Sequence, residues 1–223
     1  MKRAVIIVAG GKGTRMGSTL PKQFMQIGGE PILCRTINKF RHFDPQMTII
    51  IALPAQWAAA WVQISAGHIA PNSYIIAEGG EQRYHSVKNA LMKVPNDIDL
   101  IGVHDGVRPL VSVKTIANAY TEAALHGNAV PCIAPPESIR VVNPDGGSTP
   151  IDRNTVKLIQ TPQVFAADIL RTAYSLPYIP EFTDDASVVE KYGHTIHLID
   201  GDRENIKITT IDDLKYAEYA IKQ

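Results

Sequence analysis

Glycines and basic residues gather in one short stretch near the start of the sequence. Residues 8–17 read VAGGKGTRMG, which places Lys12 and Arg15 among four glycines, and Lys22 follows soon after. Glycine has no Cβ, so backbone N–H groups in such a loop can approach phosphate oxygens closely. Three neighbouring cations suit a polyphosphate ligand. The stretch therefore predicts a phosphate-binding loop; the plainer alternative is a glycine-rich turn whose charges are solvated.

The two commonest nucleotide-binding patterns do not describe this loop. A dinucleotide-binding loop has the spacing G-x-G-x-x-G, whereas the glycines here stand at positions 10, 11, 13 and 17. A P-loop has a lysine directly after its last glycine, whereas Lys12 precedes Gly13. The loop therefore indicates a different mode of phosphate binding.

A carboxylate ends a later apolar run. Residues 100–104 read LIGVH, and Asp105 follows directly. If this run is a parallel strand, its carboxyl end faces the crevice in which α/β proteins bind ligands. Mg²⁺ is typically held by one or two carboxylates together with substrate phosphates and water. Asp105 is therefore a candidate metal ligand, with a helix cap as the alternative, and we expect His104 to be structural.

The overall composition limits the classes of protein to which the chain can belong. Of 223 residues, 45% are hydrophobic and 20% are charged, which argues against disorder. The 22 Lys and Arg balance the 22 Asp and Glu, so we expect neither nucleic acid nor a membrane surface as a partner. No apolar run is long enough to span a membrane, and residues 4–10 are too short for a secretory signal. Cys34 and Cys132 lack metal-ligand spacing, which favours a cytoplasmic location.

Continuous apolar runs alternate with helical spacings along the chain. A parallel strand covered on both faces needs apolar residues at every position, and runs of this kind occupy residues 3–9, 48–53, 73–77, 100–104 and 129–134. Helical spacings lie within residues 32–40, 87–94 and 116–124. Strands that alternate with helices indicate βαβ units. We therefore predict a single α/β domain over residues 1–223, with a mostly parallel, twisted, Rossmann-like sheet flanked by helices.

The pattern changes after residue 135. Residues 138–142 form a candidate strand, NPDGG at 143–147 is a strong turn, and 156–159 form a candidate return strand. We interpret residues 137–159 as an inserted β-arm that projects from the sheet. One chain alone would leave the apolar residues of this arm poorly buried. Beyond it we expect helices at 166–175, 185–192 and 211–221, and strands at 195–199 and 206–208.

Six motifs in order resemble those of the sugar- and alditol-phosphate nucleotidyltransferases, and together they are similar to the 2-C-methyl-D-erythritol 4-phosphate cytidylyltransferase family. They are the glycine-rich loop, LPKQF at 20–24, HDGVRP at 104–109, TPQ at 161–163, TDDAS at 183–187 and NIKIT at 205–209. The family pattern HDAARP is changed here at Gly106 and Val107, which leaves both charged positions in place. Asp185 stands where the family has glutamate. The resemblance extends from about residue 4 to residue 220.

The resemblance implies that CMP is transferred from CTP to 2-C-methyl-D-erythritol 4-phosphate, with release of pyrophosphate, in non-mevalonate isoprenoid precursor synthesis. A phosphate oxygen is then the nucleophile, and since it is already ionised at neutral pH, no general base is needed. Catalysis depends instead on positioning and positive charge. The residues implied for this role are Arg15, Lys22 and Lys207, with Mg²⁺ or another divalent cation at Asp105.

The same resemblance implies two groups of binding residues. For the nucleotide they are Ala9, Gly10, Gly11, Lys12, Gly13, Gly80, Glu81 and Ser86. For the alditol phosphate they are Arg108, Ser138, Arg140, Asp152, Arg153, Thr161 and Thr183. Arg153 is expected to grip the phosphate bound by a neighbouring subunit, which implies a homodimer that exchanges its β-arms.

Other functions share part of this pattern. A ribitol 5-phosphate or other pentitol phosphate cytidylyltransferase has the same loop, LPKQF and HDxVRP, and residues 49–57 look more like that group. The DR pair at 152–153 and the TDDAS segment favour the methylerythritol family instead. A non-catalytic nucleotide-sensing module would not need all of the cations and Asp105 together, and a dehydrogenase would need the dinucleotide glycine spacing.

Overall fold

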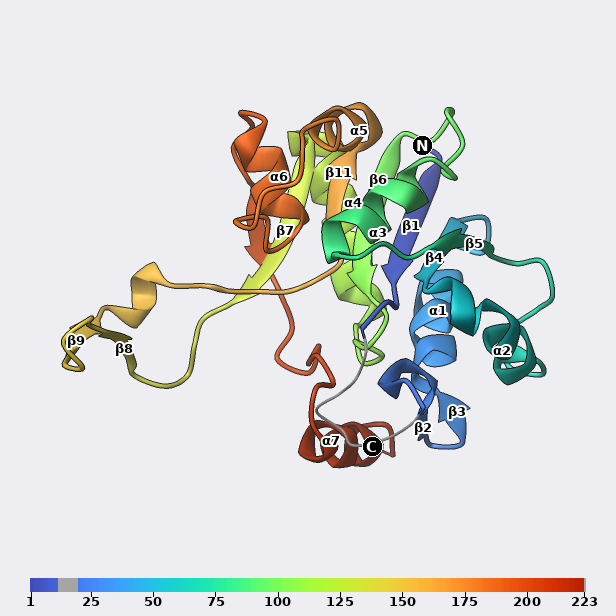
Figure 1. The fold of residues 1–223 in the computed structure, drawn as a ribbon, viewed down its shortest axis with the longest axis horizontal. Helices are drawn as coiled ribbons and strands as arrows, with labels where there is room; N and C mark the ends of the chain where they lie inside the picture. The colour runs from blue at the N-terminus through green and yellow to red at the C-terminus, as the bar shows by residue number, and fades with distance from the viewer. Residues whose placement is uncertain (12–19, 223) are drawn as a thin grey trace.

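The centre of the molecule is a twisted eight-stranded sheet, and the computed structural model describes residues 1–11 and 20–222 around it (Figure 1). The strand order is β10-β7-β11-β6-β1-β4-β5, with β12 paired to β7. The bounds are β1 (Arg3–Val8), β4 (Thr48–Leu53), β5 (Ile75–Glu78), β6 (Leu100–Asp105), β7 (Asn128–Ile133), β10 (Leu158–Ile159), β11 (Gln163–Ala166) and β12 (Leu198–Asp200). Strands β5, β4, β1 and β6 pair in parallel, whereas β11 runs antiparallel to both of its neighbours. The predicted mostly parallel α/β sheet is confirmed.

Helices cover both faces of the sheet. One face carries α1 (Ile32–Phe43), α2 (Ala55–Ser65) and α4 (Val113–His126), and the other carries α3 (Arg83–Leu91), α5 (Ala167–Ala173) and α6 (Asp185–Lys191). Strand β1 shows why its sequence is apolar throughout. Ala4 and Ile6 pack under the second set of helices, Val5 and Ile7 pack under the first, and all four are fully buried. A strand covered on both faces has no position left for a polar side chain.

A third, smaller cluster lies beside the carboxyl ends of the central strands. It joins the short strand β2 (Gln26–Ile27), which pairs with β3 (Glu30–Pro31), to the final helix α7 (Ile211–Ala220). Helix α7 begins at a capping box, in which the Thr210 hydroxyl accepts from Asp213 N and the Asp213 carboxylate accepts from Thr210 N. This cap fixes where the chain turns after the segment that carries Lys207.

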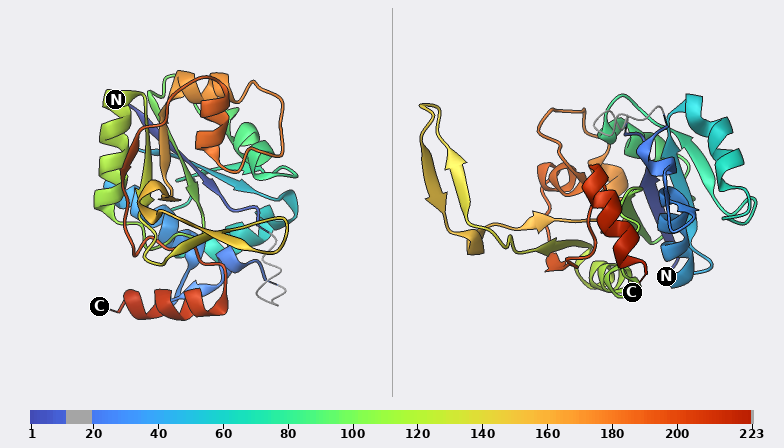
Figure 2. Two further views of the ribbon diagram at one scale, coloured as in Figure 1. Left: turned by 90° about the vertical axis from the view of Figure 1, so that its left-hand side faces the viewer. Right: turned by 90° about the horizontal axis from the view of Figure 1, so that it is seen from below.

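The expected β-arm is present, and it projects away from the sheet (Figures 1 and 2). Its hairpin pairs β8 (Ile139–Val142) with β9 (Ser148–Ile151), followed by the 3₁₀ turn η3 (Arg153–Thr155). The return strand predicted at residues 156–159 is therefore wrong: β9 is the return strand, and β10 pairs with β7 of the main sheet instead. Strand β9 reads STPI and is exposed on both faces, so it carries no burial pattern that a sequence could reveal.

The remaining differences concern short elements. In the part of the chain that the structure describes, residues 206–208, expected as a strand, form none, and the strand expected at 195–199 begins only at residue 198, as β12. Helix α2 and strand β11 were not predicted. Within the part of the chain that the structure describes, the helices are all too short or too polar to cross a membrane.

Candidate active site

The carboxyl ends of β1 and β6 lie side by side where the strand order reverses. Val8 pairs with Asp105, and Gly106 N donates a hydrogen bond to Val8 O at 2.9 Å. Such a switch point is the usual ligand site of an open α/β sheet, and a cavity of about 640 Å³ opens here. The cavity brings together nine of the predicted residues: Ala9, Gly10, Gly11, Lys22, Gly80, Glu81, Ser86, Asp105 and Lys207.

Asp105 is the centre of a charged cluster at this edge. Its Oδ2 lies 3.1 Å from Lys207 Nζ and 3.2 Å from Arg108 Nε, and its Oδ1 lies 3.7 Å from Arg83 Nε. Burial alone would raise the pKa of the Asp105 carboxyl. The charges of Arg83, Lys207 and Arg108 outweigh burial and hold that pKa well below its usual range. Asp105 is therefore a carboxylate throughout the pH range in which enzymes work.

Lys22 comes to this edge from a distant part of the sequence. It begins a short 3₁₀ turn, Lys22–Phe24, directly after Pro21, and its Nζ donates to Ile208 O at 2.9 Å. Ile208 directly follows Lys207 in the sequence, so this bond holds the Lys22 ammonium close to the segment that carries Lys207, and both lysines line the cavity. The buried amide of Gln23 donates to Ala9 O at 2.5 Å and ties the same turn to the end of β1.

Arg83 is the site residue that sequence reasoning missed. Its Nη2 donates to Asp185 Oδ2 at 2.6 Å, and Asp185 Oδ1 accepts from Tyr174 OH at 2.7 Å. Asp185 is fully buried. Although this aspartate is shorter than the glutamate of the family pattern, it still reaches Arg83 and Tyr174. The pair positions Arg83 between Asp185 and Asp105 in the cavity wall. The signal was present in the sequence as an arginine after GGEQ, but its partner lies 102 residues away.

A backbone turn before α3 forms another wall of the cavity. Ser86 Oγ accepts from Gly80 N at 3.0 Å and donates to Gln82 O at 3.2 Å. A Cβ at Gly80 would lie 2.2 Å from His85 Cβ, so only glycine allows the turn to fold back on the helix. Ser86 lies within α3, and its hydroxyl closes this turn beside Gly10. The turn thereby places Gly80, Glu81 and Gln82 in the lining of the cavity.

His104 lies behind Asp105 and is fully buried. Its Nδ1 is 3.0 Å from Thr161 Oγ1 and its Nε2 is 3.3 Å from Arg108 O. Thr161 Oγ1 also accepts from Asp105 N at 3.1 Å. These bonds fix the end of β6, which agrees with the structural role expected for His104. The predicted contact of Thr161 with substrate stays a prediction.

We predict that His104 makes the fold sensitive to acid. Burial lowers the pKa of this imidazole to about 3. Below the pKa of about 6.5 that an unfolded histidine has, the unfolded chain takes up a proton that the folded chain does not, so stability falls as pH decreases through this window. From pH 7 to pH 5 the loss is about 2 kcal/mol. Urea unfolding at the two pH values measures it.

His104→Gln should reduce this pH dependence, because glutamine keeps a polar side chain but does not titrate. His42→Gln, at an exposed position on α1, is the matched control and should keep the wild-type difference. An equal change in unfolding free energy for all three chains would show that His104 is not the group responsible.

The other predicted substrate residues lie outside the cavity lining. Arg108 is behind Asp105, where its Nη1 donates to Asn205 O at 2.8 Å. Thr183 is exposed just before α6. The remaining four belong to the arm and are exposed: Ser138, Arg140, Asp152 and Arg153.

The arm side chains contact the arm and its base. Arg140 Nη2 donates across the hairpin to Ser148 O at 2.7 Å, and Asp152 accepts from Asn154 N at 2.9 Å. Arg153 Nη1 donates to Pro136 O at 2.9 Å. The chain by itself does not bring these residues to the cavity. Lys12, Gly13 and Arg15, which were predicted for the triphosphate, lie outside the described residues.

Comparison with known proteins gives a consistent set of relatives. The family model described as IspD: 2-C-methyl-D-erythritol 4-phosphate cytidylyltransferase matches residues 3–223. A protein of that name from Bacteroides fragilis is 50% identical over 97% of this chain and 98% of its own length. One from Phocaeicola vulgatus is 49% identical over 99% of this chain and 100% of its own. The crystal structure of the enzyme of that name from Thermus thermophilus is 29% identical and superposes over the full length of both chains with a TM-score of 0.79.

Proposed function

Since the chain belongs to the 2-C-methyl-D-erythritol 4-phosphate cytidylyltransferase family, we propose that the cavity between β1 and β6 binds CTP and holds the reacting phosphates. The chain is a nucleotidyltransferase that transfers CMP from CTP to 2-C-methyl-D-erythritol 4-phosphate in isoprenoid biosynthesis. The relatives do not favour the pentitol phosphate alternative.

The observation that carries the proposal is the excess of positive charge around Asp105. Arg83, Arg108 and Lys207 all lie within 4 Å of this one carboxylate, and Lys22 lines the same cavity. These residues come from four separate segments of the chain. Two buried carboxylates, Asp105 and Asp185, would balance only two of the three cations that surround Asp105, and a triphosphate would supply further negative charge.

The chemistry follows from that charge. An ionised oxygen of the alditol phosphate attacks the α-phosphorus of CTP; the new P–O bond forms while the bond to the β-phosphate oxygen breaks, and pyrophosphate leaves. No proton has to be removed from the nucleophile. The barrier comes from repulsion between two anions and from charge on the five-coordinate phosphorus. Lys22 and Lys207, with Arg15, would lower it by holding both groups in line and offsetting that charge.

The residues also fit a magnesium ion, provided that it arrives with the triphosphate. Asp105 Oδ1 faces Arg83 only at 3.7 Å, beyond hydrogen-bond distance, so it keeps coordinating capacity in the cavity. The surrounding cations disfavour a bare divalent ion, whereas the charge of a triphosphate reverses that balance. Asp105 would hold the ion, whose chemistry is to neutralise and orient the triphosphate oxygens.

We predict that Asp105→Asn lowers turnover at ordinary Mg²⁺ concentration by at least about 10-fold, because an amide is a weaker ligand. Raising Mg²⁺ should recover part of the loss. Initial rates across a Mg²⁺ titration measure both effects. The matched control is Asp99→Asn, which lies directly before β6, at the end of the strand opposite to Asp105. Its rate should depend on Mg²⁺ concentration as that of the wild type does. Wild-type activity without any dependence on a divalent cation would contradict the metal role.

For the second substrate we propose a site completed by a homodimer. The arm exposes Val141, Val142 and Ile151, with Val142 75% exposed, and a two-stranded hairpin of this kind is marginal without a partner. Exchange of arms would bury these residues and bring Ser138, Arg140, Asp152 and Arg153 towards a neighbouring cavity. Thr161, Thr183 and Arg108 would complete the site from the body of the other chain.

We further propose that the protein works in the cytoplasm on small molecules, without nucleic acid or a membrane as a partner. The described cysteines, Cys34 and Cys132, are both buried and unpaired, which suits a reducing compartment. The equal numbers of acidic and basic residues give no broad positive field.

A further inference from the structure

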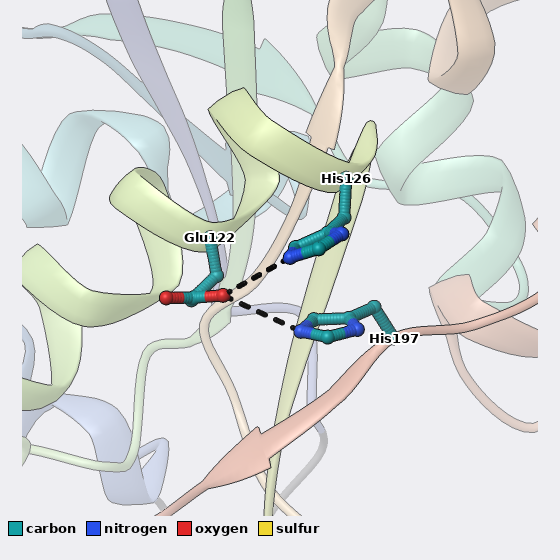
Figure 3. A group of neighbouring side chains, drawn as sticks. All are labelled: Glu122, His126 and His197. Carbon is teal, nitrogen blue, oxygen red and sulfur yellow. Dashed lines mark ion pairs between the residues drawn. The ribbon is translucent and has the colours of Figure 1, made fainter.

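A second group of functional side chains lies where the end of α4 meets the start of β12. Glu122 and His126 are one turn apart on α4, and His197 directly precedes β12 (Figure 3). Glu122 Oε2 is 3.4 Å from His126 Nε2 and 3.4 Å from His197 Nε2. Residues four apart on a helix share one face, so the sequence places two of the three together and the fold supplies the third.

The backbone that carries these side chains is fixed. His197 N donates to Asn128 Oδ1 at 2.8 Å, and His197 O accepts from Val130 N at 2.9 Å. The amide of Asn128, itself nearly fully buried, also donates to Thr195 O at 2.9 Å. On the other side, His126 is the last residue of α4, which Gly127 ends with φ of 81°. The backbone positions of the three residues are therefore fixed before any ligand arrives.

The two imidazoles share one carboxylate oxygen as their neighbour. Their rings stack with centroids 3.9 Å apart, and both Nε2 atoms point at the same carboxylate oxygen (Figure 3). All the candidate ligand atoms lie within 4.8 Å of one another. Zinc binds imidazole nitrogen and carboxylate oxygen at about 2.0–2.2 Å. In a tetrahedron with bonds of that length the ligand atoms are about 3.4 Å apart, which is the separation found here between the carboxylate and each ring.

We infer that Glu122, His126 and His197 bind a divalent transition-metal ion of the zinc type, with water in the fourth position. An ion bound between the three side chains would replace the present contact of both rings with one carboxylate oxygen. The site lies next to the carboxyl end of α4, where a helix favours positive charge. These residues are absent from the cavity lining, so the site is separate from the nucleotide site. Its effect would be to clamp β12 to α4, just before the chain segment that runs on to Lys207.

The direct test is a zinc titration of the metal-free chain against a chromophoric chelator, without nucleotide. We expect one zinc ion per wild-type chain at micromolar protein. His126→Gln and His197→Gln should each weaken binding by more than about 10-fold, because they remove a ligand rather than a residue that supports one. His42→Gln, at an exposed position on α1, is the matched control. Asp105→Asn tests whether zinc binds in the nucleotide cavity instead. Both the His42→Gln and the Asp105→Asn chain should keep the wild-type zinc stoichiometry.

Two further measurements guard against variants that fold poorly. In the unaltered chain, zinc at about 100 times its dissociation constant should raise Tm by about 5–10 °C, and cobalt(II) should give the visible absorption of a four-coordinate ion. Glu122→Gln keeps the shape of the side chain and should lose most of the Tm rise. Unchanged zinc affinity in both histidine variants, or a wild-type chain that binds no zinc at micromolar protein, would overturn the inference.

Discussion

Lys22→Ala is expected to lower turnover by about 10²- to 10³-fold while leaving the fold intact. The ammonium group lines the cavity, and its hydrogen bond to Ile208 O holds it next to Lys207. Alanine removes a fixed positive charge from the place where negative charge develops on the transferred phosphorus. The loss of one such group from a preorganised site costs about 3–4 kcal/mol of transition-state stabilisation. Steady-state kcat with saturating CTP and 2-C-methyl-D-erythritol 4-phosphate measures the effect.

The matched control is Lys114→Ala, which removes an exposed lysine on α4. It should change kcat by less than about 2-fold, because an isolated surface charge contributes little. Urea unfolding of both variants shows whether the folded state is retained. A folded Lys22→Ala chain with near-normal kcat would remove Lys22 from the reaction.

Two inactive chains are expected to restore activity to each other. If Arg153 completes the cavity of the neighbouring subunit, a dimer of one Lys22→Ala chain and one Arg153→Ala chain has one site with both lesions and one site with neither. Equal amounts of the two chains give about half mixed dimers after random exchange, so the mixture should reach about a quarter of wild-type activity. Arg153→Ala alone should raise KM for the alditol phosphate and leave CTP affinity nearly unchanged, so the mixture is assayed at an alditol phosphate concentration at which this chain alone is inactive.

The control is a mixture of Lys22→Ala with a chain that carries both substitutions. Every site in that mixture has at least one lesion, so activity should not return. Subunit exchange is verified with differently tagged chains. If exchange is complete and the first mixture stays inactive, Arg153 acts within its own chain or outside the site.

The long buried strands could be predicted closely from the sequence because both of their faces are covered. The run at residues 48–53 coincides with β4, and the run at 100–104 ends one residue short of β6. Short or exposed elements could not be predicted in this way. Strand β9 buries nothing, while Leu158 and Ile159 pair with β7 of the main sheet although both side chains are exposed. Here the local apolar pattern and the tertiary strand pairing disagree, and the tertiary pairing determines which strand each segment joins.

The site could be predicted in part for a related reason. Asp105 follows an apolar run and Lys22 follows a glycine-rich stretch, and both features can be recognised in the sequence. The fold brings the two residues to one cavity. Arg83 could not be assigned, because its orientation depends on Asp185 and on the Tyr174 hydroxyl that holds Asp185. Gly106 is also explained only by the fold: a Cβ there would lie 3.0 Å from Leu33 Cδ1 and 3.1 Å from Val8 O. Spacing along the chain does not reveal such contacts.

The most direct test of the central claim is product formation by the unaltered chain with CTP, Mg²⁺ and each of two alditol phosphates. Pyrophosphate release and ³¹P NMR of the nucleotide product are followed in parallel for 2-C-methyl-D-erythritol 4-phosphate and ribitol 5-phosphate. We predict stoichiometric pyrophosphate and a cytidine diphosphate ester with the methylerythritol substrate, at a kcat/KM at least about 100-fold above that for ribitol 5-phosphate. Equal or faster turnover of ribitol 5-phosphate, or pyrophosphate release that needs no alditol phosphate, would contradict the account.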